Sequence, residues 1–175
     1  MNKKVQFNLI IALTKDGLIG QNKVLPWKIS EEIRLFNQLT NQKNSILLFG
    51  SNTFNHLPSI KLDKRQIIII GNKDQNALNT VLKEFASLNE FLNYASEELN
   101  NHTVWICGGK TLYETFPNEL INKVYCSFIK EKYIGNSYID LKVNFLQNLH
   151  LVKSYKEFDL YFKDNQNVEI YETKP

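Results

Sequence analysis

The chain has 175 residues, 43% hydrophobic and 22% charged, which is typical of one globular domain with a substantial buried core. A formal net charge of +3 with scattered lysines does not favour a nucleic-acid-binding surface. There is no Cys-x-x-Cys pair, the three histidines are widely separated, and no apolar run approaches a membrane span, so neither a zinc site nor a membrane protein is expected.

The first residues, MNKKVQFNLIIAL, imitate a secretory signal, with two lysines before an apolar run. Gln6 and Asn8 interrupt that run, and the polar segment 14–16 stands where small residues would precede a cleavage site. We therefore read the segment as a strand and expect a cytoplasmic protein. Cys107 and Cys126 lie inside apolar runs and are expected to be reduced, buried thiols.

Short and nearly continuous apolar runs predict strands that are covered on both faces, at Val5–Leu13, Ser45–Phe49, Gln66–Ile70, Thr103–Cys107 and Lys123–Ile129. Helical spacing is found between them, at Ser30–Thr40, Ser87–Leu99 and Lys110–Phe116. Alternating residues predict a final antiparallel pair, Leu151–Phe158 with Val168–Thr173. We expect an α/β fold, with a single domain over residues 1–175 and a mixed, mostly parallel β-sheet flanked by helices and ending in an antiparallel hairpin.

Helix starts are marked by Ser30, an expected N-cap, and by Ser87 with Glu90, an expected capping box. Before the first helix runs a long loop, Thr14–Lys28, of the kind that often covers an active site. Trp27 in this loop could serve only as a packing anchor.

Glu32 is the unusual residue of the first helix, because its helical neighbours Ile33, Phe36 and Leu39 form an apolar stripe. Burying an ionised carboxylate without a partner costs several kcal/mol, so such a group is paired, protonated or functional. The pattern alone leaves a buried salt bridge and a functional site equally open.

Two strand-to-helix junctions are rich in small residues. Gly108-Gly109 follows the strand VWIC, and Gly50-Ser51-Asn52-Thr53 follows the strand ILLF. Both fit the crevice at the carboxyl ends of strands where α/β sheets bind nucleotides, although a simple turn or an N-cap explains either one alone.

In order along the chain, these pieces resemble dihydrofolate reductase. The matching stretches are IALTKDGLIGQNKVLPWKISEEIRLF (11–36), FGSNTF (49–54), CGGKTLYETF (107–116) and VYCSFI (124–129). The resemblance implies an enzyme that reduces 7,8-dihydrofolate to 5,6,7,8-tetrahydrofolate with NADPH, by hydride transfer to C6 and protonation of N5. Such a reaction supports one-carbon metabolism and thymidylate and purine synthesis, and we expect a monomer whose partner is a small-molecule substrate.

The resemblance also implies roles for individual residues. Glu32 would bind the pterin and assist its protonation, Ser127 would hydrogen-bond that carboxylate, and Trp27 would hold a water beside it, so these three are the expected catalytic residues. The substrate would also contact Ile10, Ala12, Leu25, Ile33, Phe36, Leu57, Arg65, Cys107 and Tyr113. The cofactor would contact Ala12, Ile19, Gly20, Gly50, Ser51, Asn52, Thr53, Gly71, Asn72, Cys107, Gly108, Gly109, Lys110, Thr111 and Leu112. A cis peptide would join Gly108 to Gly109.

The resemblance has two weaker places. Arg65 would grip the carboxylate of the substrate's glutamate tail, but a shift of one residue would select Lys64, which cannot form the planar pairing. Many relatives carry basic residues where this chain has Ser51 and Thr111, so Lys110 and Lys73 would have to meet the cofactor phosphates.

Two alternatives to this reading stay open. A pyrimidine reductase of riboflavin synthesis shares the fold and the cofactor crevice but is not expected to carry Leu25-Pro26-Trp27 with Glu32 and Phe36. A non-catalytic pterin- or nucleotide-binding protein would be favoured by loss of Glu32 or Trp27, and both are present.

Overall fold

The computed structural model of the chain describes residues 3–165. Its strands in chain order are β1 (Gln6–Thr14), β2 (Leu18–Gly20), β3 (Ser45–Gly50), β4 (Arg65–Ile70), β5 (Lys83–Phe85), β6 (Thr103–Ile106), β7 (Ile121–Ile129), β8 (Ser137–Tyr138), β9 (His150–Ser154) and β10 (Phe158–Asp164). Its helices are α1 (Ser30–Thr40), α2 (Ser51–Phe54), α3 (Leu88–Glu98) and α4 (Lys110–Thr115), with short 3₁₀ turns at Asn118–Leu120 and Asn144–Leu146.

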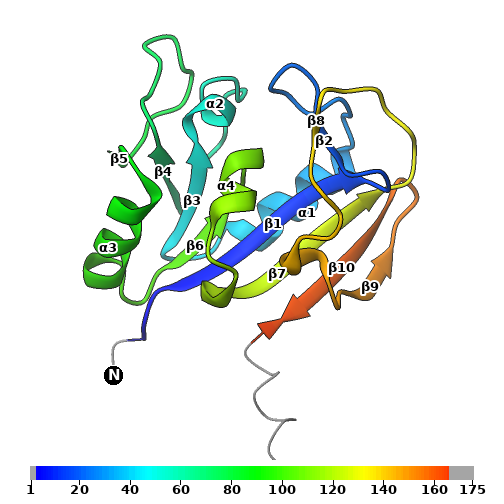
Figure 1. Cartoon of the computed structure of the whole chain (residues 1–175). Coiled ribbons are helices and arrows are strands. Elements are labelled where there is room, and N and C mark those ends of the chain that lie inside the picture. The colour runs from blue at the N-terminus through cyan, green and yellow to red at the C-terminus, as the bar shows by residue number, and fades with distance from the viewer. Residues whose placement is uncertain (1–2, 166–175) are drawn as a thin grey trace, which may run out of the picture.

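Within the described part, eight strands form one sheet in the order β5-β4-β3-β6-β1-β7-β10-β9. The first six are parallel to one another, and β10 is antiparallel to both β7 and β9. The expected α/β fold, with a mostly parallel sheet and a terminal antiparallel hairpin, is confirmed. β1 lies at the centre, between β6 and β7 (Figure 1).

The two faces of the sheet carry different helices. On one face, Leu9, Ile11 and Leu13 of β1 belong to a core cluster with residues of α3 and α4. On the other face, Ile10 belongs to a cluster against which Phe36 of α1 packs. Since successive strand residues point to opposite faces, the strict alternation along β1 separates the two cores. Figure 1 shows α1 behind the sheet and α4 in front of it.

The terminal hairpin differs from its prediction. Residues 155–157 form a turn, so Leu151–Phe158 is not one strand, and the second strand is Phe158–Asp164. The segment Val168–Thr173, predicted to be that second strand, lies outside the described residues. The residue after β7 also bonds to this turn, because the backbone N–H of Lys130 donates to the carbonyl of Glu157 at 3.0 Å.

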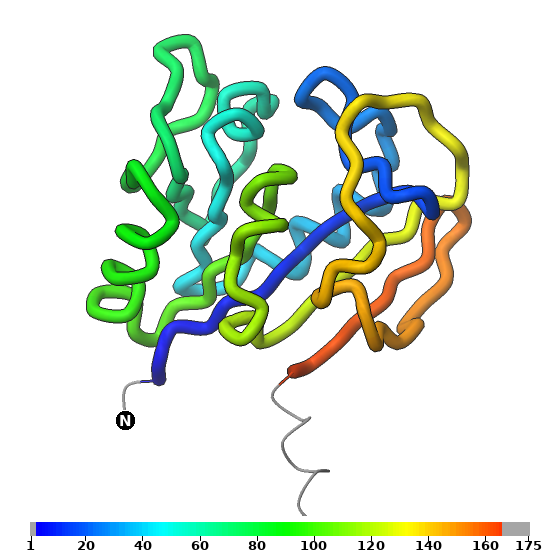
Figure 2. The backbone as a smooth tube through the Cα atoms, in the orientation of Figure 1, coloured from blue at the N-terminus to red at the C-terminus, as the bar shows by residue number. Residues whose placement is uncertain are grey.

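The long loop after β1 is more ordered than its composition indicates. It contains β2, which pairs antiparallel with β8, and a bridge between Gln21 and Val24. Asn22 and Asn136 join the same two segments by side-chain bonds. Figure 2 shows the loop, in blue, beside the segment that leads into β8, in yellow.

The helix caps confirm one prediction and correct another. Ser87 caps α3, with its hydroxyl accepting from the N–H of Glu90 at 3.2 Å, while the Glu90 carboxylate accepts from Ala86. Ser30, however, is the first helical residue of α1, and its N-cap is Ile29. The Ile29 side chain is 3% exposed, so its burial determines where this helix begins.

Cys107 and Cys126 are free thiols, half-buried and buried. Burial raises the pKa of both thiols well above the ordinary range. In residues 3–165 there is no helix long and apolar enough to cross a membrane.

Candidate active site

Glu32 lies on the inner face of α1 with only 8% of its surface exposed, as the helical spacing predicted. No ion pair or hydrogen bond reaches its carboxylate from residues 3–165. Burial therefore acts unopposed and raises the pKa of Glu32 from 4.5 to about 7. The buried salt bridge that the sequence left open does not form within the described chain.

Ser127 lies on the sheet face that α1 covers. It is paired with Ala12 in the register of β1 and β7, two residues beyond the pair Ile10 and Tyr125. Side chains two residues apart point to the same face, and Ile10 packs with the α1 cluster. Ser127, 4% exposed, therefore lies on the same side of the sheet as Glu32, but within residues 3–165 the predicted hydrogen bond between the two side chains is not formed.

Trp27 is a packing anchor as well as a candidate site residue. Its ring lies 5.6 Å from that of Tyr133 and belongs to a buried cluster with Ile29 and Phe158. Its indole Nε1 is buried, and no acceptor in residues 3–165 bonds it. An unpaired buried donor costs about 1–3 kcal/mol, so a ligand atom or water that accepts from this N–H would remove that cost.

Tyr113 connects α4 to the centre of the sheet. Its hydroxyl donates to the backbone carbonyl of Ile10 at 2.8 Å. Burial raises the pKa of Tyr113 well above its ordinary value, and the nearby Glu32 charge adds to this effect.

The apolar residues predicted to bind substrate fall into two groups. Phe36, Leu57 and Cys107 pack against the cluster that contains Ile10. Leu25 and Ile33 are 50% and 46% exposed, which is unusual for large apolar side chains flanking a buried carboxylate. These two side chains are therefore available to cover an apolar ligand.

Arg65, rather than Lys64, is the buried cation at the start of β4, with 4% of its surface exposed. Its Nη1 donates to Asn37 Oδ1 and Thr40 Oγ1 of α1, both at 2.9 Å, and its Nε donates to the carbonyl of Leu62 at 3.2 Å. Its Nη2 donates to the carbonyl of Lys61. These bonds fix the guanidinium beside α1, and Nη2 retains one further N–H.

A cleft of about 700 Å³ is lined by residues from separate parts of the chain. One wall comes from α2 and α4 with the residues before them, and the other from the long loop and the segment before β8. Of the residues predicted to bind cofactor, the cleft is lined by Gly50, Ser51, Asn52, Thr53, Gly109, Lys110, Thr111 and Leu112. The two junctions that the sequence singled out therefore meet in one cavity.

The backbones at these junctions approach each other closely. The N–H of Gly50 donates to the carbonyl of Gly108 at 2.7 Å, and the peptide between Gly108 and Gly109 is cis. A Cβ on Gly109 would stand 2.3 Å from Thr53 Oγ1. Bare backbone therefore faces a large cleft without acidic lining, an arrangement that suits the phosphates of a dinucleotide.

Several predicted cofactor residues do not line this cleft: Ala12, Ile19, Gly20, Gly71, Asn72, Cys107 and Gly108. Their contact with a cofactor stays a prediction. Conversely, the cleft is lined by residues that sequence reasoning missed: Asn22, Lys23, His56, Ile70, Leu88, Thr115, Asn136 and Ser137. The Asn-Lys dipeptide between Gly20 and Pro26 was the available signal, since asparagine favours tight turns.

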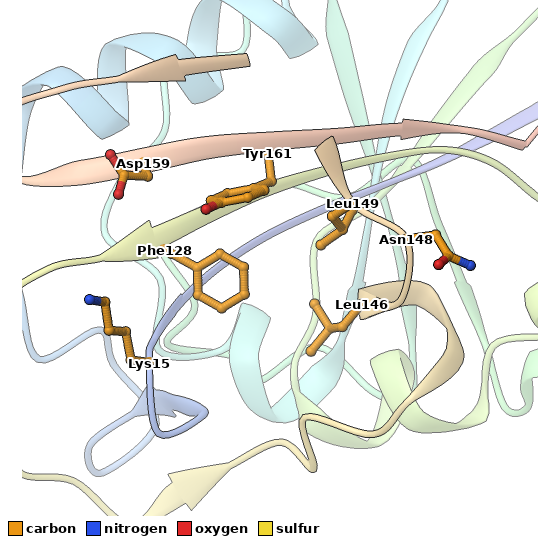
Figure 3. Close-up of a pocket in the computed structure, with 7 residues that line it drawn as sticks. All are labelled: Lys15, Phe128, Leu146, Asn148, Leu149, Asp159 and Tyr161. Atoms are coloured by element: carbon orange, nitrogen blue, oxygen red, sulfur yellow. The ribbon is translucent and has the colours of Figure 1, made fainter. Parts of the chain in front are cut away.

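A second hollow, of about 420 Å³, lies on the face of the sheet opposite to Glu32 (Figure 3). It is lined by Lys15, Phe128, Leu146, Asn148, Leu149, Asp159 and Tyr161. Phe128 follows Ser127 on β7 and so points away from Glu32. Asp159 is already paired with Lys130 at 3.1 Å, and Phe128 contacts Tyr161 edge to face, so this hollow has no unpaired acid to offer.

Comparisons with known proteins agree with this geometry. A profile of the family described as "Dihydrofolate reductase" matches residues 6–170. The dihydrofolate reductase of Mycoplasma genitalium is 33% identical over 161 residues, covering 90% of this chain and 97% of that protein. That of Ureaplasma parvum serovar 3 is 31% identical over 166 residues, covering 95% and 96%.

Among solved structures, the fold is similar to that of the dihydrofolate reductase from Enterococcus faecalis complexed with NADP(H) and RAB-propyl. The TM-score is 0.70 at 20% identity, covering 93% of this chain and 96% of that one. Because the profile spans nearly the whole chain, with relatives above 30% identity over almost their full length, this chain belongs to the dihydrofolate reductase family.

Proposed function

We propose that this protein is an NADPH-dependent dihydrofolate reductase that converts 7,8-dihydrofolate to 5,6,7,8-tetrahydrofolate. The observation that carries the proposal is Glu32, a buried carboxylate without a protein partner beside a cleft suited to a dinucleotide. The 2-amino group and N3 of a pterin form a planar edge of N–H donors. A carboxylate in a dry site accepts two such bonds strongly, because the effective dielectric is lower than in water.

The pKa of Glu32 also suits a proton-transfer role. Burial raises this pKa to about 7, so near neutral pH the protonated and ionised forms are both populated. General acid–base groups work best when their pKa lies near the working pH. In this proposal Glu32 holds the pterin edge and supplies the proton that ends on N5, while Ser127 and the Trp27 N–H orient the groups around it.

The cofactor fits the cleft described above. When bound there, NADPH supplies the hydride that is added to C6 of the pterin. The bare backbone of Gly50 and Gly109 and the donors of Ser51 and Thr53 would hold its phosphates and ribose. Ala12 lies next to Ser127 in the sheet register, which supports the predicted contact with the nicotinamide.

The substrate's glutamate tail would bind Arg65. The four bonds to Lys61, Leu62, Asn37 and Thr40 hold the guanidinium in place, so its remaining N–H meets a tail carboxylate without ordering a flexible side chain. Leu25 and Ile33 would cover the pterin and the linker to the tail. No observation in the described chain favours the pyrimidine-reductase alternative.

The test is NADPH oxidation with dihydrofolate in excess, run in parallel with NADH. We expect dihydrofolate-dependent oxidation, faster with NADPH. Glu32→Gln should lower turnover strongly and leave NADPH affinity nearly unchanged, whereas the matched variant Glu31→Gln, at the exposed ion pair with Arg34, should keep full turnover. Absence of dihydrofolate-dependent oxidation with both cofactors would refute the function, and would leave a binding protein as the reading.

We further propose a single-domain, cytoplasmic monomer. All proposed groups of the site come from one chain, and the free thiols Cys107 and Cys126 suit a reducing compartment. Sedimentation equilibrium at micromolar concentration tests the monomer, since a dimer would give twice the molar mass of one chain.

A further inference from the structure

The long loop contains a tight two-residue turn whose central residues, Asn22 and Lys23, line the cleft. The N–H of Gln21 donates to the carbonyl of Val24 at 2.8 Å, and the N–H of Val24 donates back at 3.1 Å. The two central residues, Asn22 and Lys23, have φ values of 48° and 70°. Positive φ at both central positions defines a type I′ turn, in which asparagine followed by glycine is the preferred pair.

Lys23 therefore stands where a glycine would cost less. L-residues with a long side chain rarely adopt the left-handed conformation, and such outliers persist where the surrounding structure holds them. Here Asn136 stabilises the turn. Its Oδ1 accepts from the Asn22 N–H and its Nδ2 donates to Asn22 Oδ1, both at 3.0 Å, while its own N–H donates to Gly20 at 3.1 Å.

The turn thus presents Lys23 to the cleft from a fixed position, while the α2 and α4 residues Ser51–Thr53 and Lys110–Leu112 also line it. In Figure 2 the long loop, in blue, lies across from the backbone of α2 and α4. Lys23 and Lys110 are the lining side chains with a full positive charge, and none of the lining residues is acidic. Lys110 already has Glu114 at 3.8 Å. Lys23, in contrast, makes no ion pair with any residue between 3 and 165.

We propose that Lys23 binds a phosphoryl group of the dinucleotide cofactor across the cleft. This inference rests on the proposed function and extends it. Lys23 provides the unpaired charge on a wall that otherwise offers neutral donors, and Asn136 positions it through Asn22.

The test is the dissociation constant of NADPH in the absence of substrate, followed by quenching of intrinsic tryptophan fluorescence or by calorimetry. Lys23→Gln should weaken NADPH about tenfold at low salt, equivalent to about 1.4 kcal/mol, and should reduce the salt dependence of binding. The matched control is Lys28→Gln, an exposed lysine in the same loop that does not line the cleft, and it should change affinity less than about twofold.

Binding of NADH, which lacks the 2′-phosphate of NADPH, identifies the phosphoryl group that Lys23 contacts. If Lys23→Gln weakens NADH by the same factor, the contact is with the diphosphate; if only NADPH is weakened, it is with the 2′-phosphate. Both results support the inference. The inference is overturned if Lys23→Gln binds NADPH and NADH as tightly as Lys28→Gln does, even when the wild-type protein reduces dihydrofolate. If the wild-type protein binds no NADPH, the proposed function is overturned as well.

A double-mutant cycle tests the positioning by Asn136. Asn136→Ala should weaken NADPH in the wild-type background and have little effect on Lys23→Gln, because the lysine that it positions is then absent. Equal losses in both backgrounds would show that Asn136 acts independently of Lys23 and would refute the positioning.

Discussion

Replacing Glu32 with glutamine should stabilise the ligand-free protein at pH 8 while lowering its activity. The carboxyl pKa is raised from 4.5 to about 7 in the folded state, so between these values the folded protein holds a proton that the unfolded chain has lost. Stability from this group is complete below about pH 4.5 and is lost as the pH rises through 7. The difference of about 2.5 in pKa corresponds to a loss of about 3 kcal/mol at pH 8 and less than about 1 kcal/mol at pH 5.

Glutamine keeps the shape of Glu32 and cannot ionise. The neutral side chain has its own burial cost, but that cost is the same at both pH values. We therefore expect the stability of Glu32→Gln relative to wild type to rise by about 2.5 kcal/mol between pH 5 and pH 8. With a urea m-value of about 2 kcal/mol/M, the urea midpoint should shift by about 1.2 M.

The assay is urea unfolding of the ligand-free protein, followed by tryptophan fluorescence at the two pH values. Glu31→Gln is the matched control, since it lies one residue away in an exposed ion pair and should change stability by less than about 1 kcal/mol. If the Glu32→Gln difference from wild type were the same at pH 5 and pH 8, the carboxylate would not be buried without a partner, and the reasoning would fail.

Three further substitutions test other parts of the site. Arg65→Leu should weaken dihydrofolate much more than a pterin without the glutamate tail; equal losses, measured as kcat/KM, would make Arg65 purely structural. Gly109→Ala should weaken NADPH binding and destabilise the fold by about 1–3 kcal/mol, because its Cβ would stand 2.3 Å from Thr53 Oγ1. Thermal unfolding should show partial rescue by adding Thr53→Ala, and no rescue would point to the backbone instead. Tyr113→Phe should cost about 1 kcal/mol through loss of the 2.8 Å bond to Ile10, and an unchanged urea midpoint would contradict that bond.

The strands and the inward-facing acid could be predicted because their signals are local. Four apolar residues in a row at Ser45–Gly50, or Phe36 one turn after Glu32, are visible in a short window. The predicted start of α1 was wrong, because the preference of Ser30 for the N-cap position is weaker than the stabilisation from burying Ile29. Tertiary packing regularly overrides such local preferences.

The hairpin turn and the outer wall of the cleft depend on distant contacts. Residues 155–157 contain no glycine, proline or asparagine, and their turn is closed by Tyr155 stacking on Phe158 at 4.4 Å and by the bond from Lys130. Asn22 and Asn136 are 114 residues apart, and nothing in either segment alone indicates that they pair. Strands of two or three residues, such as Leu18–Gly20 and Ser137–Tyr138, are also too short to show a period.

The central place of β1 has a consequence for how the protein is made. Among the strands of residues 3–165, β1 is synthesised before the others, whereas its neighbours β6 and β7 are among the later ones, and its bonds to Asn122 and Tyr113 span 115 and 103 residues. At a synthesis rate of about 5–20 residues per second, the apolar side chains of β1 remain without these partners for roughly 5–20 s. The centre of the sheet therefore closes only after β7 is made. A nascent chain that stops before β6 leaves β1 with two unpaired edges, and one that stops between β6 and β7 leaves it with one, open to aggregation.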